Sequence, residues 1–273
     1  MKRALLAALA IAALLVGLVG TVAAAAPADN PGKNPPGFVR IVFITYAKDL
    51  GPANPLRPSS AVADVIGSEG DGYIYSGYHW SNAKIPVHYS VNPKLPRSKV
   101  SNAYVEGIKA AFQTWEDDPD SYIDFAYDGT TNAGISSLRG RMDRKNVVGW
   151  ADLNSVQWLG PGVIAVTVYW YNTDTLELAE VDVAMNSNGY KWWQEPAGET
   201  WNSGDISSAY DVDVQNIMTH EVGHCLVLDD LYEDRNSGKT MYGYADEFEL
   251  NKRSLENADI AGIGVIYPGI TKP

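Results

Sequence analysis

The stretch HEVGHCLVLDD, residues 220–230, holds two of the four histidines in the chain. Residues four positions apart on an α-helix project only about 40° from each other around the axis, so His220 and His224 share one face and both imidazoles can reach a single ion. A catalytic zinc ion takes three protein ligands and leaves its fourth position to water. Glu221 follows the first histidine directly, where a carboxylate can reach that water as general base. The stretch therefore predicts a helix that carries part of a zinc site.

The helix around this stretch also has an apolar side. We expect the helix to begin within residues 208–213. Met218, Val222 and Cys225 form an apolar stripe beside the histidines, so one side can pack in the core while the other faces a cleft. Cys225 lies about 100° from His224 around the axis, which favours a small buried hydrophobe over a zinc ligand.

Upstream of the helix, alternating apolar residues and short β-prone runs predict strands. A stripe of apolar residues at three- and four-residue spacing predicts a helix that Ser98 caps and that ends near Glu116. Because several strands come first and the histidine helix comes late, this order favours an α+β domain, a twisted mixed β-sheet packed with helices. The expected strands cover residues 38–46, 85–91, 121–127, 146–150, 163–171 and 180–186.

The N-terminal 80 residues differ in composition from the rest. Residues 1–26 have the charged start, apolar run and small terminal residues of an export signal, which predicts a secreted protein. An uncleaved membrane anchor is the alternative, because the run is long enough to cross a bilayer. Residues 27–80 begin with a Pro- and Gly-rich linker. Within them, residues 38–78 form either a pro-segment or an added strand of the main domain.

The charge of the exported part excludes several partners. Loss of residues 1–26 removes two of the 21 basic residues and none of the 33 acidic ones, which leaves a net charge of −14. Nucleic acid and anionic lipid are therefore poor partners, and membrane contact is expected only if the N-terminal segment is retained. Acidic surface on an exported protein admits calcium sites, with Asp174, Asp182 and Asp205 as candidates.

From residue 81 to about residue 268 the chain resembles the metzincin metallopeptidases, and within them the matrixin-like group. In that family the motif His-Glu-x-x-His continues as x-x-Gly-x-x-His/Asp, and a methionine turn and a C-terminal helix follow. HEVGHCLVLDD has Asp230 at the third-ligand position, TMYGY has Met241 at the methionine turn, and ENADIAGIGVIYP matches the closing helix. LPRSKVSNAYVEGIKAAFQTWED resembles the first helix of the family, and VIAVTVYWY and EVDVAMN resemble its edge strand and the next strand.

This resemblance implies a metzincin-like domain over residues 81–270, with an active-site helix, a Met-turn and a C-terminal helix. It implies one catalytic Zn²⁺ held by His220, His224 and Asp230. Glu221 is then the general base, and the predicted function is that of a secreted zinc endopeptidase.

The resemblance also implies how a substrate is held. An extended protein or peptide substrate would pair backbone to backbone with the edge strand near Val163, Ile164 and Ala165. The segment from Met241 to Tyr244, which includes Tyr242, would form a wall of the pocket for the side chain after the cleaved bond.

Two positions depart from the family pattern. Val227 stands where the family has a glycine, and a β-branched residue at positive φ costs roughly 1–2 kcal/mol or more. Either the turn is made differently or the helix runs further. Asp230 replaces the commoner third histidine, and Asp229 beside it is a rival ligand. A catalytically inactive, secreted binding protein of metzincin fold, with the third ligand misplaced by Val227, is therefore an alternative function. Hydrolysis of other carbonyl or amide groups is a third.

Another class of zinc peptidase takes its third ligand from a glutamate about 19 or 20 residues after the second histidine. Those positions are Gly243 and Tyr244 here, so that pattern fails. Three glutamates remain as irregular third-ligand candidates. They are Glu247, Glu249 and Glu256.

Many matrixins keep the zinc blocked by a cysteine of the pro-segment. This chain has no cysteine before Cys225, which excludes such a latch, and leaves Asp64 or Asp71 as candidates for an acidic one. The structural zinc site that relatives build from several histidines is not expected, because only His79 and His88 remain.

Overall fold

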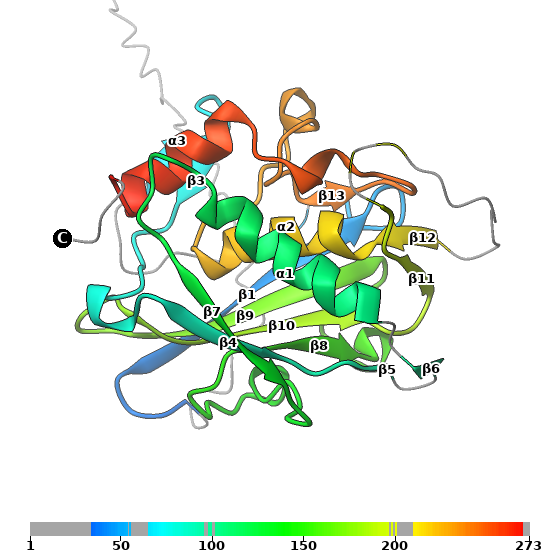
Figure 1. Cartoon of the computed structure of the whole chain (residues 1–273), viewed down its shortest axis with the longest axis horizontal. Helices are drawn as coiled ribbons and strands as arrows, with labels where there is room; N and C mark the ends of the chain where they lie inside the picture. The colour runs from blue at the N-terminus through cyan, green and yellow to red at the C-terminus, as the bar shows by residue number, and fades with distance from the viewer. Residues whose placement is uncertain are drawn as a thin grey trace, which may run out of the picture.

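A computed structural model gives the fold (Figure 1). It describes residues 34–53, 55, 65–95, 98–99, 102–196, 198, 200 and 210–269. The expected export signal, the latch candidate Asp64 and the calcium candidate Asp205 lie outside these residues. Among the described residues, no helix has the length and apolar character needed to cross a membrane.

A seven-stranded mixed sheet forms the centre of the molecule, in the order β13-β1-β9-β10-β8-β4-β7. Strand β9 is antiparallel to both of its neighbours, and the other pairings in this sheet are parallel. The strands are β1 (Phe38–Ala47), β4 (Val87–Val91), β7 (Phe125–Thr130), β8 (Val147–Ala151), β9 (Val163–Asn172), β10 (Leu178–Asn186) and β13 (Tyr244–Ala245).

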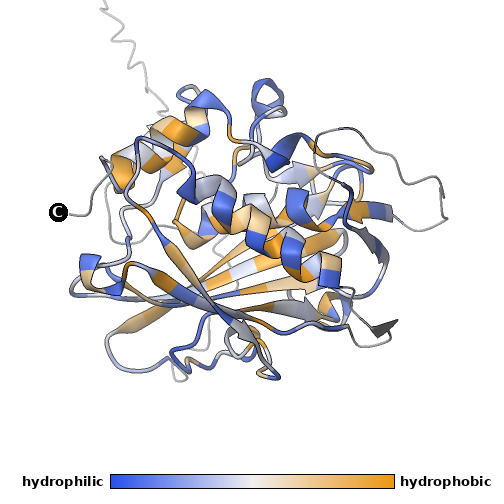
Figure 2. Cartoon of the chain, viewed as in Figure 1, coloured by the Kyte–Doolittle hydropathy of each residue, from blue (hydrophilic) through white to orange (hydrophobic). Residues whose placement is uncertain are grey.

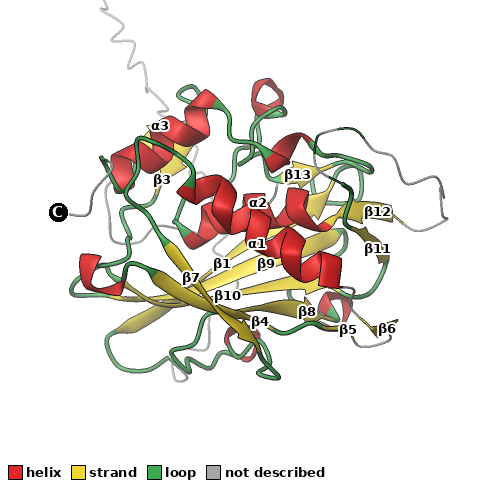
Figure 3. Ribbon diagram, viewed as in Figure 1, coloured by secondary structure: helices red, strands yellow, loops and turns green. Residues whose placement is uncertain are grey.

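Three α-helices lie on one side of this sheet, as Figures 1 and 3 show. They are α1 (Asn102–Glu116), α2 (Val214–Cys225) and α3 (Asn257–Ile266). Helix α2 contacts both α1 and β9, which places it between the first helix and the middle of the sheet. The expected α+β class, with helices packed on a mixed sheet, is confirmed.

Short elements complete the described fold. The short strands pair as β2 (Ile66–Ser68) with β3 (Tyr73–Tyr75), β5 (Lys94–Leu95) with β6 (Ser98–Lys99), and β11 (Tyr190–Trp193) with β12 (Tyr210–Asp213). The 3₁₀-helices are η1 (Asn82–Lys84), η2 (Ser137–Arg139), η3 (Leu153–Ser155), η4 (Asp234–Asn236) and η5 (Asn251–Arg253).

Strand β9 is apolar along almost its whole length because both of its faces are covered. One face packs under α1 and α2, where Trp115 donates its indole N–H to the carbonyl of Thr219 at 2.8 Å. The other face packs against loops around η2 and η3, in a second apolar cluster that includes Val166 and Leu153. A strand buried on both faces has no polar alternation. In Figure 2 the central strands are largely hydrophobic, and α1 above them mixes hydrophobic and hydrophilic residues.

The structure corrects three local expectations. Ser98 lies in β6, so it does not cap α1, which begins at Asn102. The strand expected at residues 121–127 is Phe125–Thr130, because a turn follows α1 up to residue 120 and Ser121 forms an isolated bridge with Pro268. The segment expected to be an edge strand, residues 163–171, is not an edge, because β1 pairs along it. Within residues 38–78, residues 38–47 form strand β1 of the main sheet.

Candidate metal centre

Helix α2 begins at a firmly anchored residue. Asp213 is its N-cap, and Oδ1 of this carboxylate accepts a 2.8 Å hydrogen bond from the backbone N–H of Asn216. Arg253 donates to both oxygens of the same carboxylate, from Nε to Oδ1 at 2.9 Å and from Nη2 to Oδ2 at 2.6 Å. The helix expected to begin within residues 208–213 thus begins one residue later, at Val214. These bonds fix the N-terminus of α2, the helix that carries both histidines, to the rest of the domain.

The helix ends in a Schellman turn made by a valine. The N–H of Leu228 bonds to the carbonyl of Gly223 at 3.0 Å, and the N–H of Val227 bonds to the carbonyl of His224 at 2.9 Å. Val227 takes a φ of 70°, the left-handed conformation that glycine adopts more easily. Its side chain is completely buried, and burial of a valine offsets roughly the strain of that conformation. The turn is therefore made in the way a glycine would make it.

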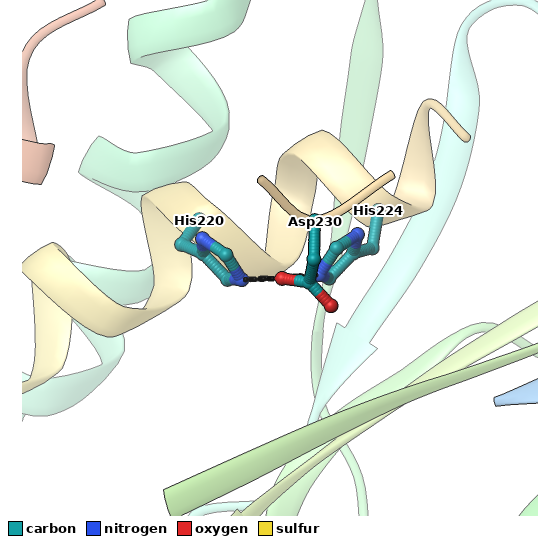
Figure 4. Close-up of side chains that lie close together, drawn as sticks. All are labelled: His220, His224 and Asp230. Atoms are coloured by element: carbon teal, nitrogen blue, oxygen red, sulfur yellow. Dashed lines mark hydrogen bonds and ion pairs between the residues drawn. The ribbon is translucent and has the colours of Figure 1, made fainter. Parts of the chain in front are cut away.

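Beyond this turn the chain folds back and brings Asp230 to the two histidines. Nε2 of His220 and Nε2 of His224 lie 3.0 Å apart, and Oδ1 of Asp230 lies 3.2 Å and 3.3 Å from them. Figure 4 shows the three side chains converging from the helix and from the segment that crosses it. Tetrahedral zinc with bonds of about 2.0–2.1 Å has ligand-to-ligand edges of about 3.3–3.4 Å. The triangle of donor atoms is close to that size.

Both imidazoles are oriented by backbone carbonyls. Nδ1 of His220 donates to the carbonyl of Thr240 at 2.7 Å, and Nδ1 of His224 donates to the carbonyl of Leu228 at 2.7 Å. A carbonyl can only accept, so a neutral imidazole in either position keeps its proton on Nδ1 and its lone pair on Nε2. Metal-binding histidines are oriented by this kind of second hydrogen bond. The two Nε2 lone pairs therefore face the carboxylate of Asp230.

The carboxylate of Asp230 is incomplete without a cation. Its Oδ2 accepts a 3.0 Å hydrogen bond from the hydroxyl of Tyr232. Its buried Oδ1 faces the two Nε2 atoms, and while both imidazoles are neutral with their protons on Nδ1 it has no hydrogen-bond partner among the residues that the structure describes. A buried charged oxygen without a partner is costly, and three acceptor atoms aimed at one point fit a metal ion. The three residues are the one group of histidine, cysteine, aspartate and glutamate in the described chain that could hold such an ion.

Without a metal, a proton takes the place of the cation. Burial opposes charge on His224, but the carboxylate of Asp230, with a smaller contribution from Glu221, outweighs it and raises the pKa of His224 to about 9. Burial also opposes charge on Asp230, yet the two histidines hold the pKa of its carboxyl well below its usual range. The site thus favours positive charge between these three side chains.

The structure separates Asp230 from its rivals. Oδ1 of Asp229 accepts a hydrogen bond of 2.5 Å from Ser76. Asp229 is not part of the cluster of His220, His224 and Asp230 that could hold a metal ion. The irregular candidates are also engaged elsewhere: Glu249 binds Asn216 and Lys252, Glu247 faces the backbone of Asp211, and Glu256 is the N-cap of α3.

Glu221 is completely buried next to His220 in α2, and both of its carboxylate oxygens accept hydrogen bonds from threonine hydroxyl groups. Thr45 of β1 donates to Oε1 at 2.6 Å, and Thr167 of β9 donates to Oε2 at 2.5 Å. Phe43, two residues before Thr45, stacks on the imidazole of His224 with ring centroids 4.3 Å apart and planes 4° from parallel. Sequence reasoning missed Phe43, Thr45 and Thr167, because no local pattern marks the partner of a strand residue.

The segment after η4 forms the floor of the site. Met241 is fully buried, and a Cβ added at Gly223 of α2 would lie 2.2 Å from its sulfur, so the two segments touch directly. The carbonyl of Met241 accepts from the N–H of Leu231, and the N–H of Gly243 donates to the carbonyl of Leu231. Tyr242, predicted to wall a substrate pocket, lies between these two contacts and bridges to Leu231. These bonds hold Met241 beneath the histidine helix.

The predicted substrate-binding residues of β9 are all buried and lie along β1. Val163 pairs with Tyr46, and Ala165 pairs with Thr45. Ile164 lies between them and is also buried. A role for these residues in substrate binding stays a prediction, and in this structure their partner is β1.

Other predicted sites are not assembled. Asp182 uses its carboxylate to accept the N–H groups of Ser137 and Val147, and its burial, the largest influence, raises its pKa to about 7. Asp174 is exposed in a turn and joins no group of metal ligands in the described chain. Asp71, a latch candidate, binds the hydroxyl of Ser68 at 2.6 Å, away from the histidines.

The two remaining histidines also lie apart from any metal group in the described chain. His88 pairs with Asp128 at the surface, and His79 forms a β-bridge with Glu177. Calcium and a second zinc ion therefore find no assembled site among the described residues.

No family model matches this chain, and no curated protein matches it.

Proposed function

We propose that this chain is a secreted, zinc-dependent endopeptidase with a metzincin-like, matrixin-like domain. The observation that carries the proposal is the buried triangle of His220, His224 and Asp230, with an unsatisfied carboxylate oxygen at its third corner. Glu221 follows the first ligand, and Met241 lies beneath the helix, which supports the peptidase assignment over a purely structural metal site.

Two imidazole nitrogens and one carboxylate oxygen form a donor set that suits zinc. When bound, a zinc ion would polarise the scissile carbonyl and lower the pKa of water toward about 7. Glu221 would accept the proton of the attacking water on a carboxylate oxygen and deliver it to the leaving amine. Thr167 would keep the second carboxylate oxygen of Glu221 in place through its hydroxyl.

A catalytically inactive binding protein is the second candidate. The sequence suggested this candidate because Val227 could have displaced Asp230 from the ligand position. Val227 makes the required turn, so this reason does not support it. A different observation favours it, since hydroxyl groups occupy both oxygens of Glu221.

Metal content and hydrolysis together test the proposal. The purified chain should hold one zinc per molecule and cleave an unfolded protein substrate, and a chelator should abolish the cleavage. Cleavage should be measured on the intact chain and on a chain cut after Pro52, because Thr45 and Phe43 of β1 contact Glu221 and His224. The variant Glu221→Gln should keep its zinc and lose about 10²–10⁴-fold in rate. Absence of zinc, or hydrolysis that survives Glu221→Gln, would refute the proposal.

A further inference from the structure

Strand β1 lies in a slot between two other segments of the chain. On one side it runs antiparallel to β9 from Phe38 to Tyr46, and on the other it runs parallel to β13. Its amides alternate between the two sides. The N–H of Tyr46 bonds to Gly243 at 3.1 Å, that of Ala47 to Gly162 at 2.7 Å, and that of Lys48 to Ala245 at 2.9 Å. The slot therefore holds the end of β1, at Tyr46 and Ala47, by both of its edges, and the earlier residues of the strand pair with β9 alone.

The side chains of β1 divide between the two faces of the sheet. Phe43 and Thr45 point to the metal centre, where they contact His224 and Glu221. Ile44 and Tyr46 belong to the apolar cluster on the opposite face, where Val42 also packs. His220, Glu221 and His224 have no exposed surface, and β1 contributes to this burial through its contacts with Glu221 and His224.

The connection of β1 to the rest of the chain is simple. The strand precedes every other described strand, and residues 48–50, 52 and 53, directly after it, are exposed. Leu50 is 52% exposed, and the side chain of Lys48 forms a surface ion pair with Asp246. The carbonyl of Pro52 accepts a 2.7 Å hydrogen bond from the hydroxyl of Tyr244. A single cut in this stretch would leave β1 attached by non-covalent contacts alone.

We propose that β1 is a displaceable resident occupant of the groove between β9 and β13, the groove in which the metzincin resemblance places an extended substrate. Thr45 covers the general base and Phe43 covers His224, so the site stays closed until β1 leaves. The occupant also indicates the substrate class, which is an extended segment with an aromatic and a small β-branched residue at alternate positions facing the site, as Phe43 and Thr45 do. This inference rests on the proposed peptidase function.

Strand exchange tests the inference on the whole chain. A sequence-specific protease site is inserted between Pro52 and Ala53, which are both exposed. After cutting, a fluorescent synthetic peptide with the sequence of residues 38–48 should displace β1 and bind. The uncut chain should bind at least about tenfold less of it. Peptide altered at Phe43 and Thr45 to alanine should bind at least about tenfold more weakly, whereas alteration of Val42, which faces away, should matter much less.

A disulfide lock supplies the matched control. Val42 and Val168 are cross-strand partners, so the double variant V42C/V168C should join β1 to β9 when oxidised. The cut, oxidised variant should refuse the peptide, and reduction should restore binding. Cys225 should not interfere, because it is buried and burial raises the pKa of its thiol well above the usual range.

Hydrogen exchange of the intact chain adds a readout without peptide. The amides of Tyr46 and Ala47 should exchange through a local opening, faster than the amides that join β9 to β10. If these amides exchange only with global unfolding and the cut chain never takes up peptide, β1 is a permanent strand and the inference is wrong.

Zinc titration of the same samples separates this inference from the proposed function. Zinc binding without strand exchange would overturn the inference and leave the metal site. Strand exchange without zinc binding would support the displaceable strand and overturn the proposed zinc peptidase function.

Discussion

The hydroxyl of Thr45 donates a 2.6 Å hydrogen bond to Oε1 of Glu221, although 176 positions separate the two residues in the chain. The bond joins an N-terminal strand to the helix that carries the histidines. Its acceptor is a fully buried carboxylate, so loss of the donor leaves a charged oxygen with fewer partners.

The variant Thr45→Val keeps the shape of the side chain and removes the hydroxyl. We expect it to be less stable than Thr45→Ser, which keeps the hydroxyl and loses a methyl group, by about 1 kcal/mol or more. Urea unfolding of the two variants, with unchanged m-values, measures the difference. Equal stability would show that the bond to Glu221 contributes little.

Two adjacent aspartates provide a matched pair for the metal site. Asp230→Asn should weaken zinc binding by at least about tenfold, because an amide oxygen is a poorer ligand than a carboxylate. Asp229→Asn should bind zinc nearly as the unaltered chain does, since its carboxylate binds Ser76. Competition with a coloured chelator measures both affinities. The reverse order of effects would identify Asp229 as the ligand.

Zinc binding should depend on pH through His224. In the metal-free protein the raised pKa of His224, about 9, stabilises the fold fully below about pH 6.5, and this contribution disappears as the pH rises through 9. The lowered pKa of Asp230 stabilises the fold above about pH 4, and this contribution is lost in acid.

Zinc must displace the proton on His224, so the affinity of the site for zinc should rise about tenfold per pH unit up to about pH 9. Isothermal titration in buffers of different ionisation enthalpy would detect the released proton. An affinity independent of pH between 7 and 8 would contradict this coupling.

Val227 is strained and buried at once. Val227→Gly loses the burial of an apolar side chain but relieves roughly 1–2 kcal/mol of strain at a φ of 70°. Val222→Gly, in the interior of the same helix and equally buried, loses a similar burial, relieves no strain and gives up roughly a few tenths of a kcal/mol of helix propensity. Val227→Gly should therefore be the milder change, by about 2 kcal/mol in the free energy of unfolding. Equal losses would mean that Val227 carries no strain.

Local patterns were enough to predict much of this fold. The strands at residues 163–171 and 180–186 agree with β9 and β10, because continuous or alternating apolar runs report burial directly. The spacing of His220 and His224 predicted a shared face, and the structure places their Nε2 atoms 3.0 Å apart. The Asp230 position followed from the family resemblance, not from the residues alone.

Pairing between distant segments could not be predicted in this way. The sequence of β1 is β-prone, but nothing in it identifies β9 as its partner or Thr45 as a donor to Glu221. Val227 shows a second limit, since a β-branched residue is a poor choice for a left-handed turn and only its burial makes it acceptable. The pairing of β1 with β9 and the conformation of Val227 both depend on tertiary packing.

Anomalous diffraction at the zinc absorption edge, from crystals of the protein grown with zinc, would locate the ion. We expect one strong peak at about 2.0–2.2 Å from Nε2 of His220, Nε2 of His224 and Oδ1 of Asp230. No peak within the triangle, or a peak bound to the two histidines while Asp230 points away, would contradict this expectation.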